Sequence, residues 1–433
     1  METKRPLLKL PKSADIPADR DLAVDAARVG CLLLVVLIHL LMVAAVATPT
    51  GIVFSKPLED QTWFTEITWV GQIMPLFFIL GGYTGIRSWR STVARGETAS
   101  SYVYGRLLRL LRPAVPFFAV MALLQVGGSA LGIPGYILDG ITGGVGTPLW
   151  FLAAFLLAQC AVPFTSRLHE QHRWRALVLL GAAIIIIDMI TALTGISAIA
   201  WANFLFVWLF VQQLGFFLLD GSLARLRGRP GGIAWLLAII AVSYLLLTLG
   251  VLAGWYSPNM LANQNPPRGA LALLGVAQLA AFQLVAPLLR RAMRARALQA
   301  VVFIVGSRAM SVYLWHLPVI VVLTGILLLM PKVFQIPGTA FWWITRLPAY
   351  LLALTLVLLL ATPLARFESI PAKYRTGTPA ALPLAAAVLL TFTAAFLVTV
   401  AGLLLPTAVF GITATTVALL LLRSRPAAAA TRL

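Results

Sequence analysis

The chain has 433 residues, of which 60% are hydrophobic and only 11% are charged. Soluble globular proteins are about 45–50% apolar and about 25% charged, so both a soluble enzyme and a disordered chain are excluded. The formal charge of +19 belongs, in a membrane protein, to the loops that orient the chain rather than to a nucleic-acid surface. Cys31 and Cys160 lie in apolar runs and predict neither a disulfide framework nor a metal site.

Apolar stretches of about 20 residues are long enough to cross a bilayer as helices. The sequence contains twelve candidates, at 29–48, 66–86, 114–133, 148–165, 176–196, 201–219, 232–253, 269–288, 301–330, 343–363, 380–400 and 403–422. We therefore predict an all-α polytopic membrane bundle of about 10–12 transmembrane helices. The ninth stretch is too long for one straight span, so it should tilt, break or start outside the bilayer.

The distribution of Lys and Arg predicts the orientation. With the N-terminus inside, 28 of the 33 Lys and Arg residues fall in inner segments, so both termini are expected in the cytoplasm and the protein in the cytoplasmic membrane. The expected organisation is a tail over 1–19, a transmembrane domain over 20–400, an additional terminal helix over 401–422 and a tail over 423–433. Residues 166–175 are expected to form an inner loop in which His169 and His172 are solvated.

Ionisable side chains inside apolar spans are the best functional candidates, because each is costly in hydrocarbon unless it faces a partner or a cavity. They are His39, Asp188, Arg308 and His316, with Arg28 at the inner edge of the first span. Asp188 lies among isoleucines, so we expect it to face the interior and either to pair with a cation or to stay protonated.

Arg28 and His39 share one helix face, because eleven helical steps return to within about 20° of the starting direction. The rise between them is about 16 Å, which places Arg28 near the inner surface and His39 near the midplane. We therefore expect both to line one cavity open to the inner side. A neutral imidazole there could accept a proton from a hydroxyl. The alternative is a buried histidine that bonds to a neighbouring helix.

Five stretches occur in the order in which they occur in a known family. They are Arg28 to His39 (R-x10-H), Met74 to Gly82 (MPLFFILGG), Arg87 to Arg90 (RSWR), Thr147 to Leu152 (TPLWFL) and Ser311 to Pro318 (SVYLWHLP). Together they resemble the acyltransferase-3 membrane acyltransferases over roughly residues 20–400. Gly81 stands where that family usually has serine. Its members typically have about ten or eleven spans, so the helix over 401–422 would be an addition.

The resemblance implies roles for six residues. His39 and Arg28 would be catalytic, Arg87 and Arg90 would bind the acyl donor, and Trp150 and His316 would line the substrate cavity. Paired guanidinium groups at the inner end of a span suit phosphate, which they bind with forked geometry. The alternatives are ordinary positive-inside charge against lipid headgroups for the arginines, an interfacial aromatic for Trp150, and a structural buried histidine for His316.

As the resemblance implies, the function is transfer of an acyl group, often acetyl, from cytoplasmic acyl-CoA to a hydroxyl of a surface carbohydrate, glycolipid or metabolite. Acyl-CoA would be a co-substrate, and we expect no bound cofactor, no metal and no nucleic-acid partner. His39 would act as a general base or would carry the acyl group itself, and the sequence leaves both open. A secondary transporter is the alternative class, since polar residues at midspan and proline-interrupted helices also occur in carriers.

Overall fold

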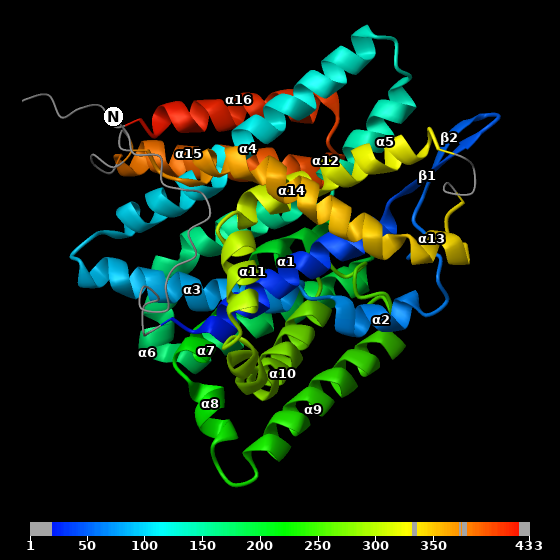
Figure 1. Cartoon of the computed structure of the whole chain (residues 1–433). Coiled ribbons are helices and arrows are strands. Elements are labelled where there is room, and N and C mark those ends of the chain that lie inside the picture. The colour runs from blue at the N-terminus through cyan, green and yellow to red at the C-terminus, as the bar shows by residue number, and fades with distance from the viewer. Residues whose placement is uncertain (1–19, 331–335, 372–373, 375–378, 424–433) are drawn as a thin grey trace, which may run out of the picture.

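The computed structural model describes residues 20–330, 336–371, 374 and 379–423, which form a helical bundle (Figure 1). Ten helical segments in this part of the chain are long and apolar enough to cross a membrane. The predicted all-α multi-pass architecture is therefore confirmed. A single two-stranded sheet interrupts it within the described residues. The tail expected over 1–19 lies outside those residues, and so does the tail expected over 423–433 except for its first residue.

The named elements of the described part of the chain are helices α1–α16 with η2, and two strands, β1 and β2. They are α1 (Leu22–Met42), β1 (Ala44–Thr48), β2 (Gly51–Ser55), α2 (Phe64–Gly71), α3 (Met74–Ala94), α4 (Ala99–Ala130), α5 (Gly135–Gly146), α6 (Leu149–Thr194), the 3-10 helix η2 (Ser197–Ala202), α7 (Asn203–Leu219), α8 (Ser222–Arg227), α9 (Gly232–Leu252), α10 (Gly269–Ala292), α11 (Arg296–Gly306), α12 (Ala309–Leu327), α13 (Ala340–Ile344), α14 (Arg346–Glu368), α15 (Ala381–Ala401) and α16 (Leu405–Leu421).

The bundle has two ends of different character. Figure 1 shows the start of α1 and the α3–α4 connection at one end and the β1–β2 hairpin at the other. The first end carries exposed Arg90, Arg95 and Arg294, and we call it the basic face. We call the other end the hairpin face. The predicted orientation would put the basic face inside, and this stays a prediction.

The first predicted span, 29–48, is too long at its C-terminal end. Helix α1 ends at Met42, and Ala44–Thr48 forms a strand that pairs antiparallel with Gly51–Ser55. Pro49 lies in the turn and cannot continue a helix, and the Thr48 hydroxyl donates to the Gly51 carbonyl at 2.8 Å. The apolar pattern did not reveal this change, because a short apolar run fits a strand as well as a helix.

The inner loop expected over 166–175 is helical instead. It lies inside α6, which the structure continues from Leu149 to Thr194 with a kink at His172 (φ −147°, ψ 58°). The predicted fourth and fifth spans are therefore two arms of one kinked helical run. The predicted ninth span does break, since α11 ends at Gly306 and α12 begins at Ala309.

Helix α16 packs as part of the bundle although it is only 17 residues long. The Gln125 amide of α4 donates to the Leu403 carbonyl at 3.2 Å, and the Tyr104 hydroxyl donates to the Leu422 carbonyl at 3.2 Å. Gly402, with φ +81°, makes the turn between α15 and α16, and glycine adopts this conformation at low cost. The predicted terminal helix is thus held at both ends by polar contacts to α4.

Asp188 faces the interior, as predicted, and has polar partners there. It is 1% exposed and accepts hydrogen bonds from the Asn203 amide at 2.9 Å and from the Gly269 backbone N–H at 2.8 Å. The Arg268 Nε lies 3.7 Å from its Oδ1. Since Asn203 begins α7 and Gly269 begins α10, one carboxylate joins the ends of three helices and satisfies a free N–H at the start of α10.

Replacing Asp188 with alanine should destabilise the protein by about 2–4 kcal/mol, because the change leaves buried donors without an acceptor. The measurement is thermal unfolding of purified protein followed by tryptophan fluorescence. Asp139→Ala is the matched control, because Asp139 is exposed on α5 and should have no such effect. Equal unfolding temperatures for the two variants would show that Asp188 is not a structural anchor.

Candidate active site

Two histidines that are 277 positions apart in the sequence meet inside the bundle. His39 Nδ1 lies 2.8 Å from His316 Nε2, and the two rings stack with centroids 5.0 Å apart. His39 comes from the C-terminal half of α1, and His316 comes from the middle of α12. His316 is fully buried, at 0% exposure. The two residues therefore form a pair in which His39 is the more accessible member.

Backbone contacts determine which nitrogens of the pair carry protons. His316 Nδ1 lies 2.6 Å from the Tyr313 carbonyl, which can only accept, so this nitrogen carries the proton. In a neutral imidazole the other nitrogen then accepts, so His316 Nε2 takes a hydrogen bond from His39 Nδ1–H. The Nε2 lone pair of His39 is left as a proton acceptor, which is the form that a general base requires.

His39 opens into a cavity at the hairpin face. The cavity has a volume of about 400 Å³, and α1, both strands, α5 and α12 contribute to its wall. Most lining side chains are apolar, among them Met42, Ile52, Phe54, Ile141 and Val321. A few polar groups interrupt this lining, namely Ser55, Lys56, Thr147 and Thr324. A molecule that carries both apolar surface and hydroxyl groups fits such a wall.

Arg28 lines a different pocket, which lies at the basic face. This inner pocket has a volume of about 150 Å³ and also includes Arg20, Asp25, Phe77 and Ser307. Arg28 Nε is buried without a hydrogen-bond partner among the described residues. An unsatisfied guanidinium nitrogen is costly, so an anion or water in this pocket would stabilise it.

The single cavity predicted for Arg28 and His39 is thus divided into two pockets. A chain of aromatic contacts leads from one toward the other. Phe77 lines the inner pocket and packs on Phe151 with ring centroids 5.1 Å apart, and Phe151 packs on Tyr313 at 4.7 Å. We call Phe77, Phe151 and Tyr313 the aromatic partition. The sequence predicted one cavity for Arg28 and His39, whereas in the structure they line different pockets.

Arg87 and Arg90 lie near the basic end of α3, as the sequence predicted. Arg90 Nη1 is 3.1 Å from Asp220 Oδ1, and its Nε is 3.4 Å from Glu170 Oε1. Partial burial disfavours the charged form of Asp220, but its hydrogen bond with His169 and the charge of Arg90 outweigh this and lower its pKa. Arg90 would therefore have to exchange carboxylate partners in order to bind a donor phosphate.

The expectation that His169 is solvated is wrong. His169 is 3% exposed, and its Nε2 lies 2.8 Å from Asp220 Oδ2 while its Nδ1 lies 2.7 Å from the Gln213 amide. His172, at the kink, is exposed as expected. Because the segment is helical, the His169 side chain lies on the helix face that packs against α7 and not on the face toward solvent.

Trp150 lies in an aromatic core at the start of α6. It is 4% exposed and stacks on Trp208 and Phe78, with ring centroids 5.2 Å and 6.4 Å away. This packing gives Trp150 a structural reason to be aromatic. The neighbouring Pro148 carbonyl accepts a hydrogen bond from the Tyr313 hydroxyl, so the segment before Trp150 still contacts the helix that carries His316.

The family of the chain follows from a comparison with family models. The acyltransferase-3 model, described as an acyltransferase domain, matches residues 21–366. The protein therefore belongs to this family and is a membrane acyltransferase that transfers groups other than aminoacyl groups. The match includes both histidines of the pair and ends before α15 and α16 begin. No curated protein and no solved structure matches the chain. The transporter alternative gains no support.

Proposed function

We propose that the protein moves an acyl group from cytoplasmic acyl-CoA to a hydroxyl group of a carbohydrate, glycolipid or metabolite that reaches His39 from the hairpin face. Acetyl is the first acyl group to test. The protein would lie in the cytoplasmic membrane with the basic face inside. One observation carries the proposal: His39 bonds to His316 through Nδ1, which leaves its Nε2 lone pair free, and the same side chain lines the cavity at the hairpin face, which we call the outer cavity.

The proposed reaction balances with the groups at hand. His39 Nε2 accepts the proton of the acceptor hydroxyl while the oxygen of that hydroxyl attacks the thioester carbonyl carbon. The new C–O bond forms and the C–S bond breaks, which leaves the acyl ester and the CoA thiolate. The imidazolium then returns the proton to the thiolate. His316, whose Nε2 accepts from His39 Nδ1, holds the ring in the reactive tautomer and stabilises its charge.

The donor would approach from the basic face, where the arginines lie. Arg28 is proposed to orient the donor, since it lines the inner pocket and its buried Nε has no hydrogen-bond partner among the described residues. Arg87 and Arg90 are further candidates for phosphate contacts, with Asp220 and Glu170 as competitors for Arg90. The inner pocket and the cavity that His39 lines share no lining residue, and we propose that the thioester reaches His39 when the rings of the aromatic partition move aside.

The decisive test is comparative mass spectrometry of surface glycans, lipids and metabolites. A deletion strain complemented with the wild-type protein should show an acylated product. The same strain complemented with the His39→Ala protein should show the unacylated precursor. Identical products from the two strains would contradict the proposal.

A cavity-filling variant tests whether the acceptor uses the outer cavity. Gly144 lines this cavity, and a Cβ added there would meet no atom within 4 Å. Gly144→Phe should therefore fold and should lower transfer by at least about tenfold by occupying the acceptor space. Gly143→Phe is the matched control, because Gly143 is equally unhindered and does not line the cavity. Equal activity of both variants would place the acceptor elsewhere.

A further inference from the structure

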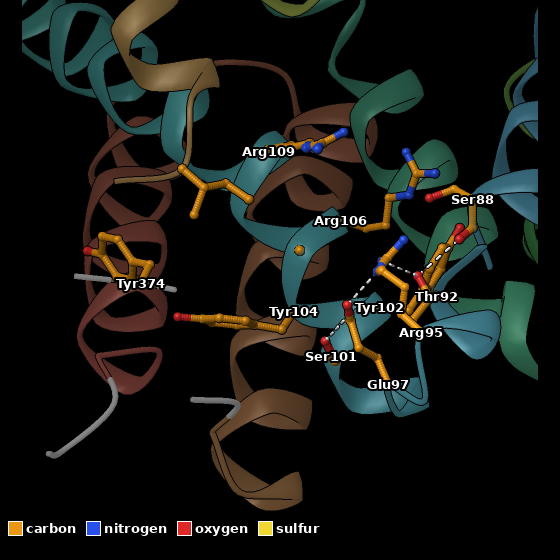
Figure 2. Close-up of a pocket in the computed structure, with 12 residues that line it drawn as sticks. Ser88, Thr92, Arg95, Glu97, Ser101, Tyr102, Tyr104, Arg106, Arg109 and Tyr374 are labelled. Atoms are coloured by element: carbon orange, nitrogen blue, oxygen red, sulfur yellow. Dashed lines mark hydrogen bonds and ion pairs between the residues drawn. The ribbon is translucent and has the colours of Figure 1, made fainter. Parts of the chain in front are cut away.

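A second basic pocket lies between α3 and α4 at the basic face, and it shares no residue with the two pockets of the candidate active site. It has a volume of about 350 Å³, and Figure 2 shows its lining side chains. We call it the α3–α4 pocket. Its charged members are Arg95, Glu97, Arg106 and Arg109, and hydroxyl groups from Ser88, Thr92, Ser101, Tyr102, Tyr104 and Tyr374 complete it.

The pocket has an excess of positive charge. Arg95 Nε lies 2.6 Å from Glu97 Oε1, and the other Glu97 oxygen accepts from the Ser101 hydroxyl at 3.0 Å. This pair is internally compensated. Arg106 and Arg109 remain, and no carboxylate lies within ion-pair distance of either in the described part of the chain.

The two remaining arginines are held together despite their like charge. They are three residues apart on α4, which places both on one side of the helix, and their charges repel each other. Arg106 is fixed over the ring of the buried Tyr102, 5.2 Å from its centroid, and Nη2 donates weakly to the Thr84 carbonyl at 3.4 Å. Arg109 is exposed. An anion bound between two guanidinium groups would offset this repulsion.

The pocket also has an electrostatic connection to the inner end of α1. The charge of Arg106 acts on Arg28 as well as on Arg109. Arg28 lines the inner pocket that also contains Phe77, the first ring of the aromatic partition. Arg106 is thus close enough to the inner end of α1 for its charge to act on Arg28, although the α3–α4 pocket and the inner pocket share no lining residue.

We infer that the α3–α4 pocket binds phosphate, and that its ligand is the nucleotide end of the acyl-CoA donor, held by Arg106 and Arg109 with the Ser88 and Thr92 hydroxyls beside them. The inference rests on the proposed function. It locates the donor on the α4 side of α3, whereas Arg90 points toward α6 and α7, where its carboxylate partners lie.

The test is titration of the purified full chain with coenzyme A, by calorimetry in phosphatidylcholine nanodiscs. The Arg106→Gln, Arg109→Gln double variant should raise the Kd for coenzyme A by at least about tenfold, because charge-assisted phosphate contacts are lost. Arg109→Gln alone should give part of this rise without a risk to folding, since Arg109 is exposed. Arg294→Gln is the matched control, an exposed arginine of the same face outside the pocket.

Other outcomes would overturn the inference. One is an unchanged Kd in the double variant, or a rise only in the Arg87→Ala, Arg90→Ala variant. A phosphatidate arm tests the other source of phosphate. If retention of phosphatidate by the protein depends on Arg106 and Arg109 but binding of coenzyme A does not, the site holds a lipid headgroup.

Failure of the site and failure of the proposed function give different results. If transfer proceeds and the KM for acyl-CoA is unchanged in the double variant, the inference fails and the function stands. If coenzyme A binding depends on both arginines but wild-type protein gives no acylated product, the function fails and the site stands. His39→Ala should bind coenzyme A as wild type does, since His39 lines the outer cavity and not the α3–α4 pocket.

Discussion

Replacing His39 with alanine should abolish acyl transfer while leaving the protein inserted and folded. His39 lines the outer cavity, and its Nε2 lone pair is free because Nδ1 bonds to His316. General-base catalysis contributes on the order of 10²–10⁴-fold to a rate. The measurement is conversion of acyl-CoA by purified protein or membranes at matched protein amounts. Activity within a few-fold of wild type would rule out His39 both as base and as acyl carrier.

The same residue permits a test between the two chemical mechanisms. If His39 carries the acyl group, wild-type protein mixed with acyl-CoA in the absence of acceptor should gain the acyl mass, and His39→Ala should not. If His39 acts as a base, no adduct should form on His39 although transfer requires it. Intact-protein mass spectrometry after a brief incubation distinguishes these outcomes. We expect no adduct, because the geometry already supplies a base.

Much of the fold could be predicted because a bilayer imposes strict rules on the chain. Each spanning segment must satisfy its own backbone, so long apolar stretches become helices. The length of 301–330 predicted that this stretch would tilt, break or start outside the bilayer, and the structure shows a break. The hairpin after Met42 could not be predicted from the apolar pattern, because its residues are as apolar as those of the helix before it. The helical structure around His172 could not be predicted either, since polar residues at the membrane surface occur in helices as well as in loops.

The sequence allowed single candidate residues of the site to be predicted, but not which of them lie in contact. The high cost of burying polar groups singled out His39, His316 and Asp188 correctly as interior residues. Their partners lie far away in the sequence. A single sequence contains no information that joins His39 to His316 across 277 positions. The helix period predicted which face Arg28 and His39 share, but not the aromatic side chains of α3, α6 and α12 that divide their cavity.

His316 is expected to act as a positioning residue through His39. His316→Ala should lower kcat on the order of 10²-fold, because His39 loses the acceptor that fixes its tautomer and stabilises its imidazolium form. The KM for acyl-CoA should not change, since His316 is fully buried and the proposed donor contacts lie at the basic face. Steady-state kinetics at several donor concentrations separates the two parameters.

Rescue distinguishes this role from a merely structural one. His316→Gln keeps an acceptor oxygen that can reach His39 Nδ1, so kcat should recover to within about tenfold of wild type. Tyr313→Phe keeps the backbone carbonyl that accepts from His316 but loses the hydroxyl that donates to the Pro148 carbonyl, so it measures how far kcat depends on a neighbouring change in α12 that spares the histidine pair. If alanine and glutamine at position 316 reduce kcat equally while both proteins are folded, His316 does not polarise His39. The tautomer of His39 that accepts the proton would then not depend on His316. The hydrogen bond between the two rings would serve only to pack α1 against α12.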